Sequence, residues 1–169
     1  MDADELPSER AARLAAELRD ANAEAVAFVD GCSEDDWRVL VPEEGWPVGV
    51  VLHHVAAGHV LVGDWVDAAR RGEDITITTD EIDEANARHA EDFAGVSREE
   101  TSELLRTNGE ELAALLEGLS DAELASEVAF TPAGGALFSA EQLCGAGARH
   151  AASHLGRVRR ALGEPDAGS

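Results

Sequence analysis

The sequence predicts an all-α protein: a four-helix bundle with a long crossover between its second and third helices. Three observations favour this fold class. Apolar residues recur at helical spacing over four long segments of the 169-residue chain. Two of these segments begin with Ser followed three positions later by Glu or Gln, as helices often do. Aromatic residues make up only 4% and tyrosine is absent, so Ala, Leu and Val must build the core, which suits closely packed helices.

The first helix is expected over residues 8–31. Pro7 and Ser8 open it, with Ser8 as the N-cap, and Gly31 ends it. Apolar residues mark one face and charged residues much of the other. Residues 33–37 predict a short capped turn, and residues 42–45 a loop.

The second helix is expected from Pro47, a residue suited to the first helical position, to about residue 71. His54, Gly58, Leu61 and Trp65 share one face of it. Gly58 leaves room beside His54 for a ligand or a close neighbour.

Residues 74–79 predict an extended crossover that is too short to found a sheet, and residues 80–93 a weaker helix. Ser97 and Glu100 form a capping box that opens the third long helix, over 97–119. The Asn108–Gly109 pair predicts a kink in its middle.

A short capped turn at 120–124 and a loop at 131–135 precede the last helix, which Ser139 caps, with Gln142 three residues on. The inward stripe of this helix comprises Leu143, Gly147, His150, His154, Val158 and Ala161. No repeat or second domain is evident. We therefore expect a single domain over residues 1–169, with flexible tails at 1–6 and 164–169.

The net charge of −22 is large for this length, and all thirteen basic residues are Arg. Such a chain lacks the clustered positive charge that nucleic acids and anionic membranes require, so neither is an expected partner. A salty cytoplasm and the Ala/Arg/Asp bias of a GC-rich genome both explain the composition.

Cys32 and Cys144 are too few for a disulfide framework, and neither a secretory segment nor a membrane span is evident. We expect a cytoplasmic protein with reduced thiols. Cys32 is expected in a loop as an inert thiol, and Cys144 as a small core residue.

The histidines carry the clearest chemical signal. His150 and His154 lie one turn apart on one helical face, where two imidazoles can bind one metal ion. The inward stripe of the second helix offers His54 as a third ligand, and three protein ligands leave a coordination position open, as in catalytic sites. Histidines that merely pack or face solvent are the competing interpretation. His53 should face elsewhere than His54, and His59 and His89 are expected at the surface or in helix packing.

Two motifs resemble those of the DinB-like superfamily. The stretch from Trp46 to His54 is similar to its "W-S-x-x-E-x-L-x-H" motif, and the stretch from His150 to Arg159 to its "H-x-x-x-H-x-G-Q-x-R" motif. The resemblance covers nearly the whole chain. It implies a four-helix bundle, often dimeric, with a metal triad of His54, His150 and His154 that holds zinc, nickel or a similar divalent ion.

The resemblance also implies a class of activity. Members include mycothiol-dependent maleylpyruvate isomerases, S-transferases that use mycothiol, bacillithiol or glutathione, and metal-dependent hydrolases. His150 stands where the isomerase branch tends to have Glu, and the extra C-terminal domain of that branch is not seen, which disfavours an isomerase. We expect a metal-dependent thiol S-transferase acting on a small molecule, as a homodimer.

Two alternatives stay open: a metal-dependent hydrolase, and a non-catalytic, stress-related dimeric bundle. Arg157, one turn beyond His154, is a candidate for holding a carboxylate of the thiol or substrate, against the simpler interpretation of a solvated charge. No other catalytic residue is indicated.

Overall fold

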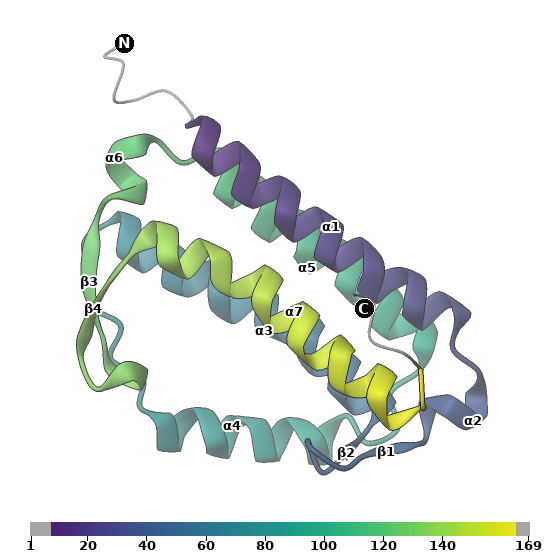
Figure 1. Ribbon diagram of the computed structural model, residues 1–169. Coiled ribbons are helices and arrows are strands. Elements are labelled where there is room, and N and C mark those ends of the chain that lie inside the picture. The colour runs from purple at the N-terminus through teal and green to yellow at the C-terminus, as the bar shows by residue number, and fades with distance from the viewer. Residues whose placement is uncertain (1–7, 165–169) are drawn as a thin grey trace.

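The computed structural model describes residues 8–164 (Figure 1). The tails expected at 1–6 and 164–169 lie outside this range, apart from Glu164. No helix within the described range has a stretch long and apolar enough to cross a membrane.

Four long helices form the bundle: α1 (Glu9–Gly31), α3 (Val48–Arg70), α5 (Arg98–Glu117) and α7 (Ala140–Ala161). α1 and α3 each pack against both α5 and α7, so α1 and α3 are diagonal to one another (Figure 1). The predicted all-α four-helix bundle is confirmed. The long crossover after α3 contains α4 (Thr79–Asp92), which runs along one side of the bundle.

Side-chain caps begin these helices where the sequence predicts them. Ser8 caps α1, and capping boxes pair Ser97 with Glu100 and Ser139 with Gln142. Short helices α2 (Glu34–Trp37) and α6 (Asp121–Leu124) replace the two predicted turns. Pro47 is the residue before α3 and not its first residue, because it is extended and pairs with Leu40.

Two β-hairpins were not predicted. Strands β1 (Leu40–Val41) and β2 (Trp46–Pro47) form one, and β3 (Glu127–Phe130) and β4 (Ala136–Ser139) the other, joined by a 3-10 turn η2 (Thr131–Ala133). The expected loop at 131–135 is thus the tip of a hairpin, where Gly134 and Gly135 have φ of 69° and 80°. The crossover is extended as predicted, and Ile75 forms an isolated bridge to Phe130.

Two apolar clusters make the core, one towards the α6 end of the bundle and one towards the α2 end. Between them, each long helix places a polar or small residue: Asn22, His59, Gly109 and Gly147 are examples. α5 runs as one continuous helix through the Asn108–Gly109 pair, and the kink expected there stays a prediction. Gly109 makes room for the side chain of Asn22, which a Cβ atom at position 109 would strike. The candidate site lies beside this middle layer.

Candidate metal centre

Three histidines from two helices meet at mid-bundle. His54 comes from α3, and His150 and His154 come from α7. One ring nitrogen of each lies within 4.8 Å of the others, and the Nε2 atoms of His54 and His150 are 3.2 Å apart. The structure therefore brings together all three residues that the sequence singled out as metal ligands.

All three imidazoles are neutral near pH 7. Burial, and then the neighbouring histidines, lower the pKa of His54 to about 4 and that of His150 to about 3. Burial also lowers the pKa of His154, although Glu44 opposes the change. Neutral imidazole is the form that binds a metal ion, so these rings need not lose a proton before they bind one at physiological pH.

Glu44 orients the third histidine. His154 Nδ1 lies 2.7 Å from Glu44 Oε1, and the same oxygen accepts a hydrogen bond from Arg157 at 2.7 Å. The Glu44 side chain is only 10% exposed. Burial raises its pKa, but Arg157 and His154 together outweigh burial and hold the pKa below its usual value. The carboxylate thus accepts a hydrogen bond from the Nδ1–H group of His154, which leaves the Nε2 lone pair of this ring for a ligand.

Sequence reasoning missed Glu44, which sits in the predicted loop at 42–45 and lies 110 residues from His154 in the chain. No motif marked it. The structure places Arg157 against Glu44 and also against Glu43, at 3.6 Å. Its guanidinium is therefore engaged within the protein.

Close packing fixes the other two rings. The Trp46 indole meets the His54 ring edge to face, with centroids 5.4 Å apart. A Cβ atom on Gly58 would lie 2.7 Å from His150 Cε1 and 3.0 Å from its Nδ1. Gly58 therefore makes room for the His150 ring, a neighbour on the facing helix.

The remaining histidines lie outside the cluster of three. His53, adjacent to His54, turns towards α4, stacks on Phe93 with centroids 4.0 Å apart and hydrogen-bonds His89 at 3.2 Å. His53 is nonetheless buried, at 6% exposed. His89 also meets the His54 ring edge to face, at 5.6 Å. The His89 side chain is half-buried and packs between α4 and α3.

His59 is fully buried in helix packing. Its Nε2 lies 2.9 Å from Asn22 Oδ1, and the Asn22 amide donates to the carbonyl of Leu105 at 2.9 Å. Burial lowers the pKa of His59 to about 4. The side chain therefore stays neutral and links three helices of the middle layer.

The two cysteines are buried and free. Burial raises the pKa of Cys144 to about 12 and also raises that of Cys32. Neither is a thiolate at neutral pH, so neither supplies a nucleophile or an anionic ligand to the cluster.

The residues present fit a divalent metal ion. Two nitrogen ligands at about 2.05 Å from a tetrahedral ion stand roughly 3.3 Å apart, close to the 3.2 Å between His54 and His150. Neutral nitrogen donors suit Zn, Ni, Cu and Fe better than Mg or Ca. A carboxylate behind a ligand histidine, as Glu44 is behind His154, is common at metal centres.

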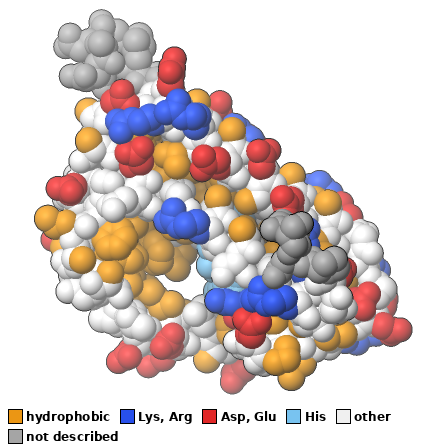
Figure 2. Space-filling view, viewed as in Figure 1, with side chains coloured by type: hydrophobic (Ala, Val, Ile, Leu, Met, Phe, Trp, Pro, Cys, Tyr) orange, Lys and Arg blue, Asp and Glu red, His pale blue; other side chains and the backbone are white. Residues whose placement is uncertain are grey.

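A cavity of about 200 Å³ adjoins the cluster, lined by residues of α3, α4 and α7 that include His54 and His150. Figure 2 shows a hollow between α7 and α4, with hydrophobic side chains along its wall and histidines at its edge. A ligand bound at the three histidines could extend into this cavity.

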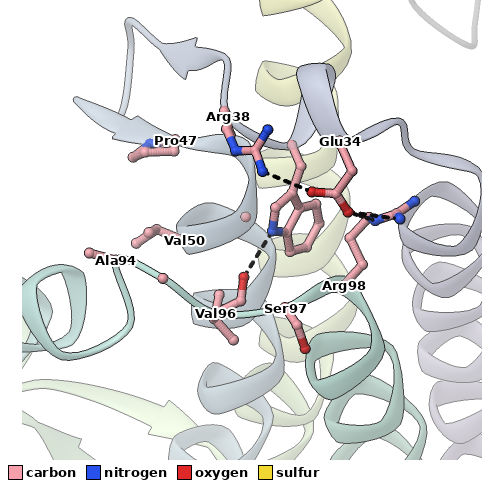
Figure 3. Close-up of a pocket in the computed structure, with 11 residues that line it drawn as sticks. Glu34, Arg38, Pro47, Val50, Ala94, Val96, Ser97 and Arg98 are labelled. Atoms are coloured by element: carbon pink, nitrogen blue, oxygen red, sulfur yellow. Dashed lines mark hydrogen bonds and ion pairs between the residues drawn. The ribbon is translucent and has the colours of Figure 1, made fainter.

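A second cavity lies near the α2 end, and the residues that line it form hydrogen bonds and ion pairs with one another (Figure 3). The Trp37 indole donates a hydrogen bond to the carbonyl of Val96 at 3.0 Å, and Glu34 pairs with both Arg38 and Arg98. These contacts tie α2 to the connection between α4 and α5.

Comparison with known proteins gives the same fold. A search of curated proteins returned no match. The solved structure of YfiT from Bacillus subtilis, described as a probable metal-dependent hydrolase with an unusual four-helix bundle topology, matches with a TM-score of 0.76 and 18% sequence identity. The match covers 94% of this chain and 91% of YfiT. The family model of the DinB superfamily matches residues 17–158, most of the chain, and so the protein belongs to the DinB superfamily.

Proposed function

We propose that the protein binds a divalent metal ion, Zn²⁺ or Ni²⁺, through His54, His150 and His154, and that it catalyses transfer of a low-molecular-weight thiol to a small electrophile. The observation that carries this proposal is the cluster of three neutral ring nitrogens at the edge of an apolar cavity. Three ligands leave at least one coordination position for a reactant. When bound, the ion would lower the pKa of a coordinated thiol or water, so that it reacts as an anion near neutral pH.

The protein's own residues would hold the reactants in place. Glu44 keeps His154 in the tautomer that offers Nε2, and Arg157 keeps Glu44 ionised in its buried position. Because Arg157 is already paired with two glutamates, we propose that it acts through Glu44 and not on a substrate carboxylate. The half-buried rings of His54 and His150 would face the bound reactant with little bulk water around them.

Hydrolysis is the second candidate, because YfiT, which shares the fold, is described as a probable metal-dependent hydrolase. The same three histidines would serve, with water in place of the thiol. The two candidates differ in one requirement: only the transferase needs an added thiol. The expected homodimer and the cytoplasmic location remain predictions.

The test uses one electrophile of each kind. Zinc- or nickel-loaded protein would be given 1-chloro-2,4-dinitrobenzene with mycothiol, bacillithiol or glutathione, and separately 4-nitrophenyl acetate without thiol. In the first reaction the thiolate sulfur forms a bond to the ring carbon and chloride leaves. In the second, water attacks the ester and 4-nitrophenol leaves.

Thiol-dependent turnover that disappears in a folded His154→Ala variant would support the transferase. Ester turnover without thiol, lost in the same variant, would favour the hydrolase. If metal-loaded protein shows neither activity across a broad panel of thiols and esters, the non-catalytic alternative is favoured.

A further inference from the structure

The cavity beside the three histidines has a composition unlike the rest of the protein. It measures about 200 Å³ and opens between α3, α4 and α7. Its lining comprises His54, Gly58, Leu61, Val62, Trp65, Ile82, Asn86, Ala146 and His150. Apart from the two histidines, none of these residues has an ionisable side chain, in a chain with a net charge of −22.

The far wall of the cavity is aromatic and aliphatic. The Trp65 ring meets Phe130 edge to face with centroids 5.0 Å apart, and Phe130 packs on Phe138 at 5.0 Å. The β3–β4 hairpin therefore supports Trp65 from behind. Within this surround an ionised group would lose its hydration, and no oppositely charged side chain lines the cavity to compensate, which makes its burial in the metal-free protein costly.

Helix α4 supplies the remaining wall and one polar group. Ile82, Asn86 and His89 follow each other at spacings of four and three residues, so they share one face of α4. His89 contacts the His54 ring at 5.6 Å, and Ile82 and Asn86 line the cavity. Asn86 therefore lies between the histidine end of this face and Ile82.

The Asn86 amide is available to a ligand, since within residues 8–164 its side chain makes no hydrogen bond. It can donate and accept, so it can pair with a carbonyl or a hydroxyl. Besides the two histidines, the other polar group of the lining is the indole N–H of Trp65, which can donate a hydrogen bond but not accept one.

We infer that the cavity is a specificity pocket for an uncharged apolar group about the size of a substituted benzene ring, and that Asn86 hydrogen-bonds a neutral polar atom attached to that group. An apolar cavity of about 150 Å³ suffices to bind benzene, so about 200 Å³ admits a ring with a small substituent. The inference deepens the proposed function and rests on it for the reaction: the electrophile or ester would carry this group, with its reacting atom towards His54 and His150.

The pocket is tested by binding, which needs no turnover. Benzyl alcohol, benzoate and benzylammonium share one ring and differ in charge. Each would be titrated into chelator-treated protein and into zinc-loaded protein, with calorimetry and the fluorescence of the tryptophans as readouts. We expect benzyl alcohol to bind the chelator-treated protein at least about tenfold more tightly than either charged probe.

Two variants fill the pocket from opposite walls: Ala146→Leu from α7 and Ile82→Trp from α4. Each should weaken benzyl alcohol binding about tenfold or more, an effect of the size seen when a group no longer fits an apolar pocket. Ala152→Leu, the same change at an exposed position of α7, is the matched control and should bind like the wild type. Asn86→Leu should weaken benzyl alcohol binding while sparing toluene, which has no hydroxyl group.

Benzoate bound as tightly as benzyl alcohol to the metal-free protein would overturn the inference. So would unchanged binding in both filled variants, provided that circular dichroism shows them folded. Binding of benzyl alcohol together with absence of metal or turnover would instead contradict the proposed function and leave the pocket assignment standing.

Discussion

The Gly58→Ala substitution tests how the position of the His150 ring affects metal binding, separately from the stability of the fold. A Cβ atom at position 58 would lie 2.7 Å from His150 Cε1, whereas ordinary van der Waals contact begins at 3.4 Å. The His150 ring must therefore retreat by at least about 0.7 Å. Metal–ligand distances tolerate only about 0.2 Å, so we expect zinc affinity to fall roughly 10- to 100-fold, the range typical of a disturbed metal centre.

The same substitution should hardly change stability in the absence of metal. Replacing Gly by Ala within a helix favours folding by up to about 1 kcal/mol, and displacement of the His150 ring offsets part of that gain. Gly63→Ala, on the same helix as Gly58, is the matched control, because its Cβ atom would meet only Leu112 and Leu115 of α5, at 3.7 and 3.9 Å. Gly63→Ala should gain stability and keep its zinc affinity.

The assay for this pair is chelator competition for Zn²⁺, together with urea unfolding in the presence of chelator. If Gly58→Ala binds zinc as tightly as Gly63→Ala while both are folded, the His150 ring does not need the space that Gly58 leaves. A loss of folding in Gly58→Ala, with no gain in Gly63→Ala, would contradict the stability argument.

Three further predictions concern a neighbour of the site, the middle layer of the bundle and the α2 end. Glu44→Gln should weaken zinc binding roughly 10- to 100-fold, because the buried carboxylate that orients His154 loses its charge; chelator competition measures this. In the metal-free, folded protein the pKa of His59 is about 4, below its ordinary value of 6.5. As the pH falls, the unfolded chain therefore takes up a proton at His59 before the folded protein does. Stability should thus be complete above pH 6.5 and fall between pH 6.5 and 4, with His59 contributing roughly 3 kcal/mol to the loss, measured by urea unfolding. Gly49→Ala should cost about 2 kcal/mol of unfolding free energy, because its Cβ atom would lie 2.6 Å from the Trp37 ring.

Each of these has a matched comparison. Glu43→Gln changes the neighbouring glutamate, which pairs with Arg157 and Arg160 at the surface; equal zinc affinities in the two variants would argue against a special role for Glu44. A His59→Gln variant should lose stability less steeply between pH 6.5 and 4, and an unchanged slope would show that other groups dominate. Gly63→Ala is again the control for Gly49→Ala. Equal free energies of unfolding in the two variants would mean that Trp37 can move aside.

The helices and their caps were predictable because their signals are local. Ser97 with Glu100 and Ser139 with Gln142 form the expected capping boxes. The prediction that one face of the second helix points inward is confirmed, because the cavity beside the cluster is lined by all four of its residues, His54, Gly58, Leu61 and Trp65. A helical period places such residues on one face whatever the helix packs against.

What the sequence could not show depends on contacts between distant segments. Glu44 lies in a loop, and only the hairpin of β1 and β2 brings it to His154 on α7. The angular spacing of residues along the helix correctly predicted that His59 faces away from His54. The complete burial of His59, however, depends on Asn22 of α1. The β3–β4 hairpin was missed because each strand is only four residues long, which gives little alternation to detect.

The central claim is that His54, His150 and His154 hold a divalent metal ion. The most direct test is the metal content, by mass spectrometry, of tag-free protein purified without added metal, beside a His150→Ala/His154→Ala variant. We predict close to one divalent ion per chain in the wild type and its loss in the folded variant. No metal in either protein, with no uptake on titration with Zn²⁺ or Ni²⁺, would contradict this claim and leave one buried and two half-buried neutral histidines that serve helix packing alone.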